Sequence, residues 1–171
     1  GITSTSVTSL VIDPQTPTTL FAGTLDGIFK STDGGGTWSE KLIEGLSYQS
    51  VDCLAIDPVT PTTLYAGTYN GLYKTNDGGE NWNQLNPGNN PSQGDPFFTN
   101  ILVNPLAPSI LYGITSVEGV FKSTDGGENW NQVDTTPAPL YIDVFLIDPQ
   151  TPTTLYISTS DGFYISTDSG G

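Results

Sequence analysis

The chain has 171 residues with 18 acidic side chains, four lysines, no arginine and no histidine, which gives a formal net charge of -14 at pH 7. Four lysines are too few to neutralise the several phosphates that a nucleic-acid interface requires, so we expect no nucleic-acid partner. The missing histidine and arginine remove the usual neutral-pH general base, the commonest imidazole metal ligand and the bidentate carboxylate clamp. No apolar run approaches the roughly 20 residues of a membrane-spanning helix, so we expect no membrane insertion.

An internal repeat dominates the sequence. Residues 12–38 read IDPQTPTTLFAGTLDGIFKSTDGGGTW, and residues 56–82 read IDPVTPTTLYAGTYNGLYKTNDGGENW. A third copy spans residues 103–130, and a fourth begins at residue 147. A period of about 40 to 50 residues with several short strands in each copy indicates the blades of a β-propeller. We therefore expect one all-β domain over residues 1–171, with repeats at about 1–45, 46–92, 93–137 and 138–171.

Each copy is expected to form four antiparallel strands. In the second copy they fall at about residues 50–56, 63–68, 72–75 and 82–85, which are β-branched, aromatic or alternating and are separated by Gly, Pro, Asn and Asp. Tight turns that end in glycine join the second and third strands. The fourth copy stops before its last strand, so the pattern predicts three full blades and a partial fourth.

The first strand of each copy is apolar on both faces, which is typical of a strand covered on both sides. In the second copy we expect Leu54 and Ile56 to face one way, and Val51, Cys53 and Ala55 to face the other. Cys53 is the only cysteine, so it forms no internal disulfide and is expected to be a small buried hydrophobic residue. Most of the eight tyrosines fall on strand positions shared between blades and are expected to pack there, whereas Tyr69 falls in a hairpin turn.

The strings STDGGGTW at residues 31–38, TNDGGENW at 75–82 and STDGGENW at 123–130 resemble the Asp-box, S-x-D-x-G-x-T-W, of BNR-type β-propellers. The chain is similar to the repeats of sialidases, xyloglucanase-type glycosidases, sortilin-like receptors and photosystem-assembly factors of the Ycf48 type. This resemblance implies that each box forms the turn between the third and fourth strands, opposite the ligand-binding face. The box residues are Asp33, Trp38, Asp77, Trp82, Asp125, Trp130 and Asp168.

The box aspartates are interpreted as structural. A short carboxylate followed by glycines accepts the N–H groups of a turn, while the indole packs on apolar surface. The alternative is a set of calcium or catalytic sites, but a calcium loop needs alternating oxygen ligands and a distal glutamate. Each box supplies one carboxylate before its glycines, so the boxes predict turns and no metal or cofactor.

Two enzyme activities can be compared with the residue types that the chain contains. The resemblance to sialidases implies an arginine cluster for the substrate carboxylate, and this chain has no arginine. A xyloglucanase-type glycosidase needs two opposed carboxylates about 5 to 10 Å apart. The hairpin acids Asp26, Glu118 and Asp161 are candidates, but they are better explained as turn formers. The stronger candidates are Asp52 and Asp143, which open first strands where the other copies have Thr8 and Thr99. The alternative for both is a hydrated carboxylate near the central channel.

The most irregular segment, NPGNNPSQGD at residues 86–95, lengthens the connection between the second and third copies. Loops that depart from a repeat commonly carry specificity, although a tolerated surface insertion is the alternative. Phe98 takes the repeated apolar position that opens the first strand, so Phe97 is expected to be an exposed, ligand-facing contact.

These observations favour a non-enzymatic, extracytoplasmic β-propeller scaffold that makes protein or glycan contacts or assembles with itself into a ring or filament. The alternative is a fragment of a carbohydrate-active glycoside hydrolase. The expected partners are further copies of the chain or the remainder of a longer propeller, and the expected location is extracellular or at the cell surface.

Overall fold

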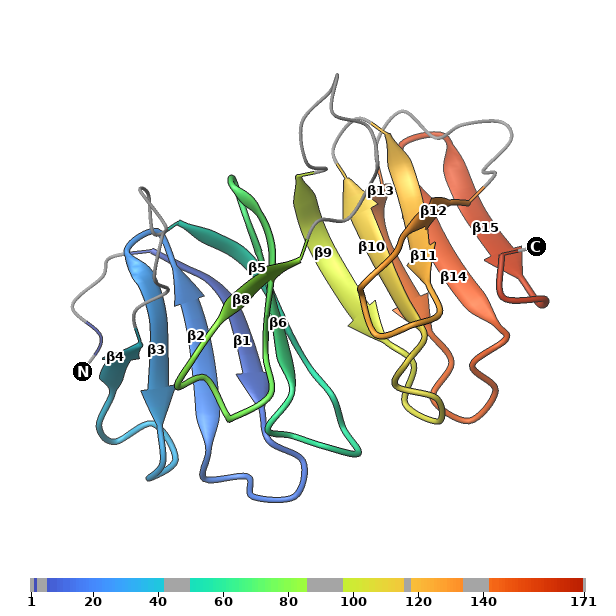
Figure 1. Ribbon diagram of the computed structural model, residues 1–171. Helices are drawn as coiled ribbons and strands as arrows, with labels where there is room; N and C mark the ends of the chain where they lie inside the picture. Colours follow the sequence, from blue (N-terminus) through green and yellow to red (C-terminus); the bar gives the residue numbers. More distant parts are fainter. Residues whose placement is uncertain are drawn as a thin grey trace.

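A computed structural model of the chain describes residues 2, 6–41, 50–85, 97–115, 118–133 and 142–170. The described residues form four antiparallel sheets that stand side by side, and they contain no helix (Figure 1). Three sheets have four strands and the last has three, so the expected all-β propeller architecture is confirmed. We call the sheets blades 1 to 4 in chain order.

The strands follow one another within each blade, so every strand pairs with its neighbour in sequence. Blade 1 contains β1 (Val7–Ile12), β2 (Leu20–Thr24), β3 (Gly27–Ser31) and β4 (Ser39–Lys41). Blade 2 contains β5 (Val51–Ile56), β6 (Leu64–Thr68), β7 (Gly71–Thr75) and β8 (Asn83–Leu85). Blade 3 contains β9 (Phe98–Val103), β10 (Leu111–Thr115), β11 (Gly119–Ser123) and β12 (Asn131–Gln132). Blade 4 contains β13 (Ile142–Ile147), β14 (Leu155–Thr159) and β15 (Gly162–Ser166).

The hairpin between the second and third strands is closed by a threonine at the end of the second strand. In blade 1, Thr24 Oγ1 donates to Gly27 O at 3.0 Å and accepts from Asp26 N at 3.0 Å. Gly27 has a φ of 136°, which a side chain would disfavour. The other blades repeat this arrangement at Thr68, Thr115 and Thr159.

Adjacent blades pack face to face through apolar side chains. The junction of blades 1 and 2 buries Phe21, Ile28, Val51, Leu54, Leu64, Ala66, Tyr73 and Trp82. The junction of blades 2 and 3 buries Cys53, Ala55, Tyr65, Leu72, Leu85, Phe98, Ile101, Leu111 and Trp130. The junction of blades 3 and 4 buries Tyr112, Ile114, Val120, Phe145 and Leu155. The core therefore lies between the blades, and each inner blade contributes to two parts of it.

The sequence-based orientation of Val51 is wrong, because β5 contains a bulge. Val51 pairs with Thr68 and Cys53 pairs with Gly67, so Asp52 is the extra residue. One extra residue reverses the alternation, which places Val51 on the side of Leu54 at the junction with blade 1. The first strands of blades 1, 3 and 4 carry the same irregularity.

Glycine on the second strand allows the next blade to come close. A Cβ on Gly67 would lie 2.5 Å from Cys53 Sγ and 2.7 Å from the backbone oxygen of Phe98. Burial raises the pKa of the Cys53 thiol to about 12, in agreement with its expected role as a small buried residue.

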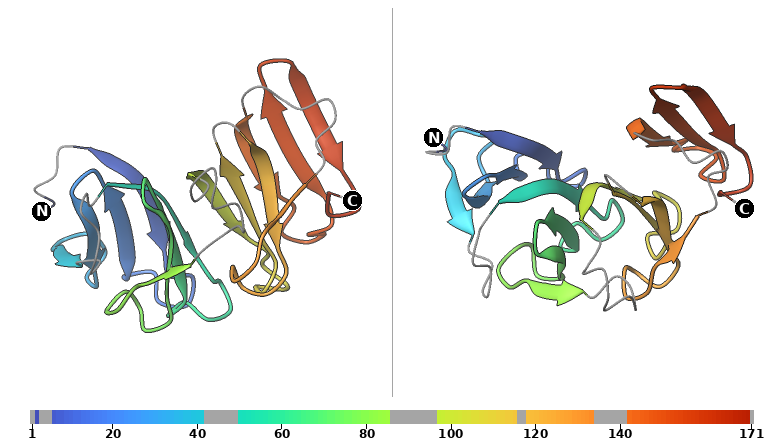
Figure 2. Two further views of the ribbon diagram at one scale, coloured as in Figure 1. Left: turned by 45° about the horizontal axis from the view of Figure 1, so that its top comes forward. Right: turned by 90° about the horizontal axis from the view of Figure 1, so that it is seen from above.

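The four blades form an open arc, with blades 1 and 4 at its two ends (Figure 2). We call the side of a blade that points to the preceding blade its leading face, and the opposite side its trailing face. The leading face of blade 1 exposes Val7, Leu10 and Ile12, and the trailing face of blade 4 exposes Val144, Leu146, Phe163 and Ile165. The corresponding positions of the inner blades are packed at the junctions. Both end faces are thus apolar surfaces without a neighbouring blade in the structure.

Replacing Trp82 by alanine is expected to destabilise the fold by about 3 to 5 kcal/mol, because the ring is only 7% exposed and fills the junction of blades 1 and 2. Trp38 is the matched control, since it holds the same position in blade 1 but is only half-buried. Chemical denaturation of Trp82→Ala and Trp38→Ala measures both effects. Equal losses for the two variants would contradict the junction assignment.

Candidate functional site

The Asp-box turns lie at one end of the blades, which we call the box end. In blade 1, Ser31 Oγ donates to Asp33 Oδ1 at 2.8 Å. Thr37 donates to the same carboxylate through its backbone N at 2.8 Å and its hydroxyl at 2.6 Å. The sequence DGG places the turn residues Gly34 and Gly35 at positive φ, which brings the chain back to the carboxylate.

The boxes of blades 2 and 3 use asparagine where blade 1 uses threonine. Asn81 donates to Asp77 at 2.9 Å from its backbone N and at 2.7 Å from its side chain. Asn129 makes the same pair of bonds to Asp125, at 2.9 and 2.8 Å. In blade 4, Asp168 accepts a bond of 2.7 Å from Ser166 Oγ. Every box carboxylate therefore accepts hydrogen bonds from its own turn.

These bonds stabilise the ionised carboxylates. Hydrogen bonds from Thr37 and Ser31 lower the pKa of Asp33 to about 2, and those from Asn129 lower the pKa of Asp125 to about 2. The pKa of Asp77 is also lowered, chiefly by its bond with the Asn81 side chain. In the described part of the chain, no group of three or more acidic or cysteine side chains is placed to hold a metal ion. The geometry is that of closed turns, and their structural role stays a prediction.

The box tryptophans differ in their surroundings. Trp130 is buried and donates from Nε1 to Gly127 O at 2.9 Å, and the half-buried Trp38 makes the equivalent bond to Gly35 O at 3.0 Å. Trp82 is buried, but its Nε1 has no hydrogen-bond partner. The indole of Trp82 thus contributes through apolar packing.

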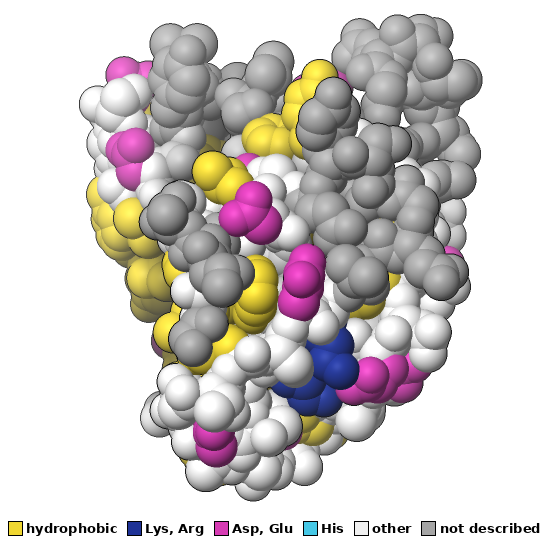
Figure 3. Space-filling view, turned by 90° about the vertical axis from the view of Figure 1, so that its left-hand side faces the viewer, with side chains coloured by type: hydrophobic (Ala, Val, Ile, Leu, Met, Phe, Trp, Pro, Cys, Tyr) yellow, Lys and Arg dark blue, Asp and Glu magenta, His cyan; other side chains and the backbone are white. Residues whose placement is uncertain are grey.

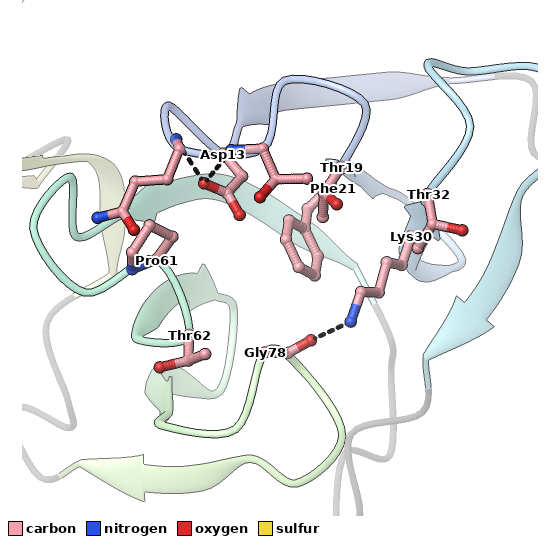
Figure 4. Close-up of a pocket in the computed structure, with 10 residues that line it drawn as sticks. Asp13, Thr19, Phe21, Lys30, Thr32, Pro61, Thr62 and Gly78 are labelled. Atoms are coloured by element: carbon pink, nitrogen blue, oxygen red, sulfur yellow. Dashed lines mark hydrogen bonds between the residues drawn. The ribbon is translucent and has the colours of Figure 1, made fainter.

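An open pocket of about 280 Å³ lies at the box end between blades 1 and 2 (Figure 4). Its two charged side chains, Asp13 and Lys30, are already engaged by the protein itself. Asp13 Oδ1 accepts from Gln15 N at 2.8 Å and Thr16 N at 3.1 Å, while Lys30 Nζ donates to Gly78 O at 2.9 Å. The pocket lining contains one carboxylate and one lysine, so it lacks the acid pair that a glycosidase needs.

The four lysines are all directed to the box turns of neighbouring blades. Lys30, Lys74 and Lys122 donate to backbone oxygens there, and Lys41 donates to both carboxylate oxygens of Glu80 at 2.9 Å. Figure 3 views the molecule from the left-hand side of Figure 1. It shows lysine side chains beside acidic ones, and hydrophobic side chains exposed along one margin. The opposite end of the blades therefore has no lysine to offset its carboxylates.

That opposite end, where the hairpins of the second and third strands lie, is called the hairpin face. It carries both candidate acids, because Asp52 and Asp143 are the bulge residues of β5 and β13. Asp52 is half-buried, its Oδ2 has no hydrogen-bond partner, and burial raises its pKa. Asp143 is exposed. Blade 3 lies between their blades, so the two carboxylates do not share a junction.

Phe97 lies at the start of blade 3 and contacts Tyr69 of the blade 2 hairpin. Their ring centroids are 6.2 Å apart with an interplanar angle of 61°, an edge-to-face arrangement. Phe97 is half-buried, whereas Tyr69 is 76% exposed. Phe97 was expected to be exposed and is instead partly covered, and the structure adds Tyr69 as its partner in an aromatic pair on the hairpin face.

The sequence places Tyr69 in the hairpin turn rather than on a strand, but it does not single this residue out as a binding residue. Tyr65, Tyr73 and Tyr112 are buried as expected. The turn was visible in the sequence, because Tyr69 precedes Asn70-Gly71 in a two-residue turn. The irregular loop at residues 86–95, Tyr48 and Tyr141 lie outside the described residues.

The comparisons with known proteins agree with this architecture. The profile of the family described as "Photosynthesis system II assembly factor YCF48" matches residues 4–171. No curated protein matches the chain by sequence.

Solved structures show the same fold at low sequence identity. An ancestral GH74 enzyme superposes with a TM-score of 0.80 and 21% identity, covering 98% of this chain and 23% of the enzyme. YCF48 from Cyanidioschyzon merolae has a TM-score of 0.66 and 17% identity over 96% of this chain and 57% of its own. A YCF48 bound to a D1 peptide has a TM-score of 0.65 and 15% identity, with 99% and 57% covered. The extracellular domain of a putative one-component system, BT4673 from B. thetaiotaomicron, has a TM-score of 0.73 and 17% identity, with 96% and 21% covered.

Asp77→Asn is expected to lower the stability of the protein near neutral pH, because the ionised carboxylate accepts the turn hydrogen bonds more strongly than an amide oxygen. The folded-state pKa of Asp77 is lowered, so its stabilising effect is fully present above the unfolded value of about 3.8. This effect is lost as the pH falls through the folded-state pKa. The gap in melting temperature between wild type and Asp77→Asn should therefore begin to narrow below about pH 3.8 and keep narrowing as the pH falls toward the lowered folded-state pKa.

Asp26→Asn is the control, since Asp26 is an exposed acid of a hairpin turn. A gap for Asp77→Asn that stays constant from pH 7 to pH 2 would count against the turn assignment.

Proposed function

The chain belongs to the photosynthesis system II assembly factor YCF48 family, and from this premise we propose that it is a non-enzymatic propeller scaffold that binds a protein partner on its hairpin face. The observation that carries the proposal is the aromatic pair of Tyr69 and Phe97 at the junction of blades 2 and 3. Tyr69 is 76% exposed, so the apolar part of its ring lies in water, which is unfavourable for the folded protein. Exposed aromatic rings of this kind are enriched where proteins bind one another.

The charge around the pair indicates the partner. Five acidic residues lie at the hairpin face in the described ranges: Asp26, Asp52, Glu118, Asp143 and Asp161. The lysines all point to box turns, as their hydrogen bonds show. A segment with apolar and cationic side chains suits this surface, because its cations meet carboxylates and its apolar groups meet the rings. The YCF48 bound to a D1 peptide is a family precedent for a peptide partner.

The absence of enzyme chemistry is part of the proposal. The GH74 structures share the blade architecture, but this chain spans only about a quarter of the first of them. The chain has no arginine or histidine, and its two bulge carboxylates belong to blades 2 and 4, which do not adjoin. A glycoside hydrolase fragment remains the second candidate function, because Asp52 has a carboxylate oxygen without a hydrogen-bond partner and a raised pKa, as a general acid requires.

The proposed scaffold lies outside the cytoplasm, and the end faces of its blades 1 and 4 associate with other copies or with further blades. The extracellular domain of BT4673 supports the location through its shared fold. The described residues contain no helix that could span a membrane. Apolar end faces on blades 1 and 4 support head-to-tail contact between copies, in a ring or filament, or contact with further blades.

The peptide proposal is tested with a fluorescently labelled D1 peptide. Fluorescence anisotropy is expected to show binding to the wild-type chain, at least tenfold weaker binding to Tyr69→Ala/Phe97→Ala, and nearly unchanged binding to Leu25→Ala. Leu25 is the matched control because it holds the Tyr69 position in the blade 1 hairpin and is also exposed. Equal binding by wild type and the double variant, or no binding by wild type, would reject the aromatic site.

The enzyme question is tested with xyloglucan and a reducing-end assay. We expect no turnover by the wild-type chain. Turnover that disappears in Asp52→Asn or Asp143→Asn would establish the hydrolase candidate and identify its acids. Turnover that survives both substitutions would point to a contaminant.

A further inference from the structure

One aromatic side chain lies at each of the three blade junctions, at the second position of β2, β6 and β10: Phe21, Tyr65 and Tyr112. Tyr65 Oη donates to Gly126 O at 3.2 Å across the junction of blades 2 and 3. Tyr112 Oη donates in the same way to Ser169 O at 3.1 Å. Both acceptors directly follow a box aspartate, and their equivalent at the junction of blades 1 and 2 is Gly78. Phe21 has no hydroxyl, so this junction lacks the corresponding hydrogen bond.

The ring of Phe21 occupies the same place in its junction as the ring of Tyr65. Phe21 Cε1 lies 3.2 Å from the place that a Cβ on Gly79 would take, and Tyr65 Cε1 lies 3.3 Å from that of Gly127. A lysine Nζ lies 5.3 Å from the centroid of the Phe21 ring and 5.5 Å from that of the Tyr65 ring. At this point the two junctions therefore differ by one hydroxyl oxygen.

The backbone oxygen of Gly78 has capacity for a second hydrogen bond. A carbonyl oxygen has two lone pairs, and Gly126 O accepts from both Lys74 Nζ and Tyr65 Oη. Gly78 O accepts from Lys30 Nζ at 2.9 Å, and no tyrosine of the described residues donates to it. A donor from outside the chain can take this second position.

The open pocket at the box end lies where the tyrosine hydroxyl is missing. Phe21, Lys30 and Gly78 all line its volume of about 280 Å³, and Figure 4 shows them at the border of one hollow. Ligand pockets in proteins span about 300 to 1,000 Å³, so this pocket suits a molecule of the size of a single sugar ring.

Hydroxyl groups dominate the rest of the pocket lining, which includes four threonines: Thr16, Thr19, Thr32 and Thr62. The loops that carry them are held by backbone bonds, because Thr19 N donates to Thr16 O and Thr62 O accepts from Gly78 N. The threonine hydroxyls are therefore available to a ligand, and each can both donate and accept.

The charges of the pocket favour a neutral ligand. Asp13 and Lys30 contribute one charge of each sign, and Lys30 Nζ also lies 3.6 Å from Glu80 Oε1. A cation would be repelled by the ammonium group of Lys30, and an anion would approach a chain with a net charge of -14. Asp13 accepts its two backbone hydrogen bonds through Oδ1, which leaves Oδ2 as an acceptor for a ligand hydroxyl.

We propose that this pocket binds a small neutral polyhydroxylated ligand, a sugar or a cyclitol, and that one ligand hydroxyl donates to Gly78 O in place of the tyrosine hydroxyl. Further ligand hydroxyls donate to Asp13 Oδ2 and exchange hydrogen bonds with the threonines. The site lies at the box end, opposite the hairpin face, so it does not depend on the proposed protein partner.

The test is Phe21→Tyr, which supplies the missing hydroxyl from the protein itself. An NMR titration with glucose, xylose, galactose and myo-inositol follows the amide signals of Gly78 and Thr62. At least one of these compounds is expected to bind the wild type with a millimolar Kd, because a small ligand in an open pocket makes few contacts. Phe21→Tyr should bind it at least tenfold more weakly and melt at the same or a higher temperature, since its hydroxyl can donate to Gly78 O.

Matched variants control for indirect effects. Tyr65→Phe makes the reverse change at the next junction and should leave binding at Gly78 unchanged. Thr62→Val removes a pocket hydroxyl at nearly constant volume and should weaken binding several-fold, whereas Thr153→Val makes the same change at the equivalent loop position of blade 4, outside the pocket, and should not. Tyr69→Ala/Phe97→Ala alters only the hairpin face and should bind as wild type does.

The inference is overturned if none of the four compounds shifts the amide signals of Gly78 and Thr62, or if folded Phe21→Tyr binds as tightly as wild type. Shifts confined to the hairpin face would also overturn it, because they would place the ligand at the other end of the blades. Success or failure of the D1 peptide experiment changes none of these outcomes.

Discussion

The structure depends on the packing of one apolar sheet face against the next. No blade has enough interior to be stable alone, because a four-stranded sheet buries its apolar side chains only when another layer covers them. The first strands are apolar on both sides for this reason, and glycine at position 67 lets the next backbone approach closely. Lys30, Lys74 and Lys122 add directed hydrogen bonds to box-turn oxygens across the junctions, and these bonds set how one blade meets the next.

Most of the fold could be predicted from the sequence, because the repeat appears four times and each copy has the same turn residues. Strand order, hairpin glycines and three full blades with a partial fourth followed from local chemistry. The orientation of Val51 could not be predicted, because a bulge at Asp52 leaves no mark in an alternating pattern. The partnership of Phe97 with Tyr69 also required the structure, since it depends on contact between residues of two blades. The position of the lysines was readable in the repeat, but their acceptors across the junctions were not.

The two ends of the blades have different chemistry. At the box end, lysines, carboxylates and turn oxygens bind one another, and the charged groups of the pocket between blades 1 and 2 are already hydrogen-bonded. At the hairpin face, carboxylates have no lysine partners and two aromatic rings meet with one largely exposed. Because the hydrogen bonds that join the blades lie at the box end, the side chains of the hairpin face can change without loss of these bonds. This division is consistent with membership of the YCF48 family and with the fold shared with GH74 enzymes.

Hydrogen–deuterium exchange of the backbone amides, resolved by strand, tests most directly whether the junctions hold the molecule together. Blades 2 and 3 are covered on both faces, whereas blades 1 and 4 each have an apolar face without a neighbour. We expect the slowest exchange in β5, β6, β9 and β10, and clearly faster exchange in the equivalent strands of blades 1 and 4. Equal protection of all four blades would contradict this expectation, because each blade would then owe its stability to its own strands rather than to its neighbours.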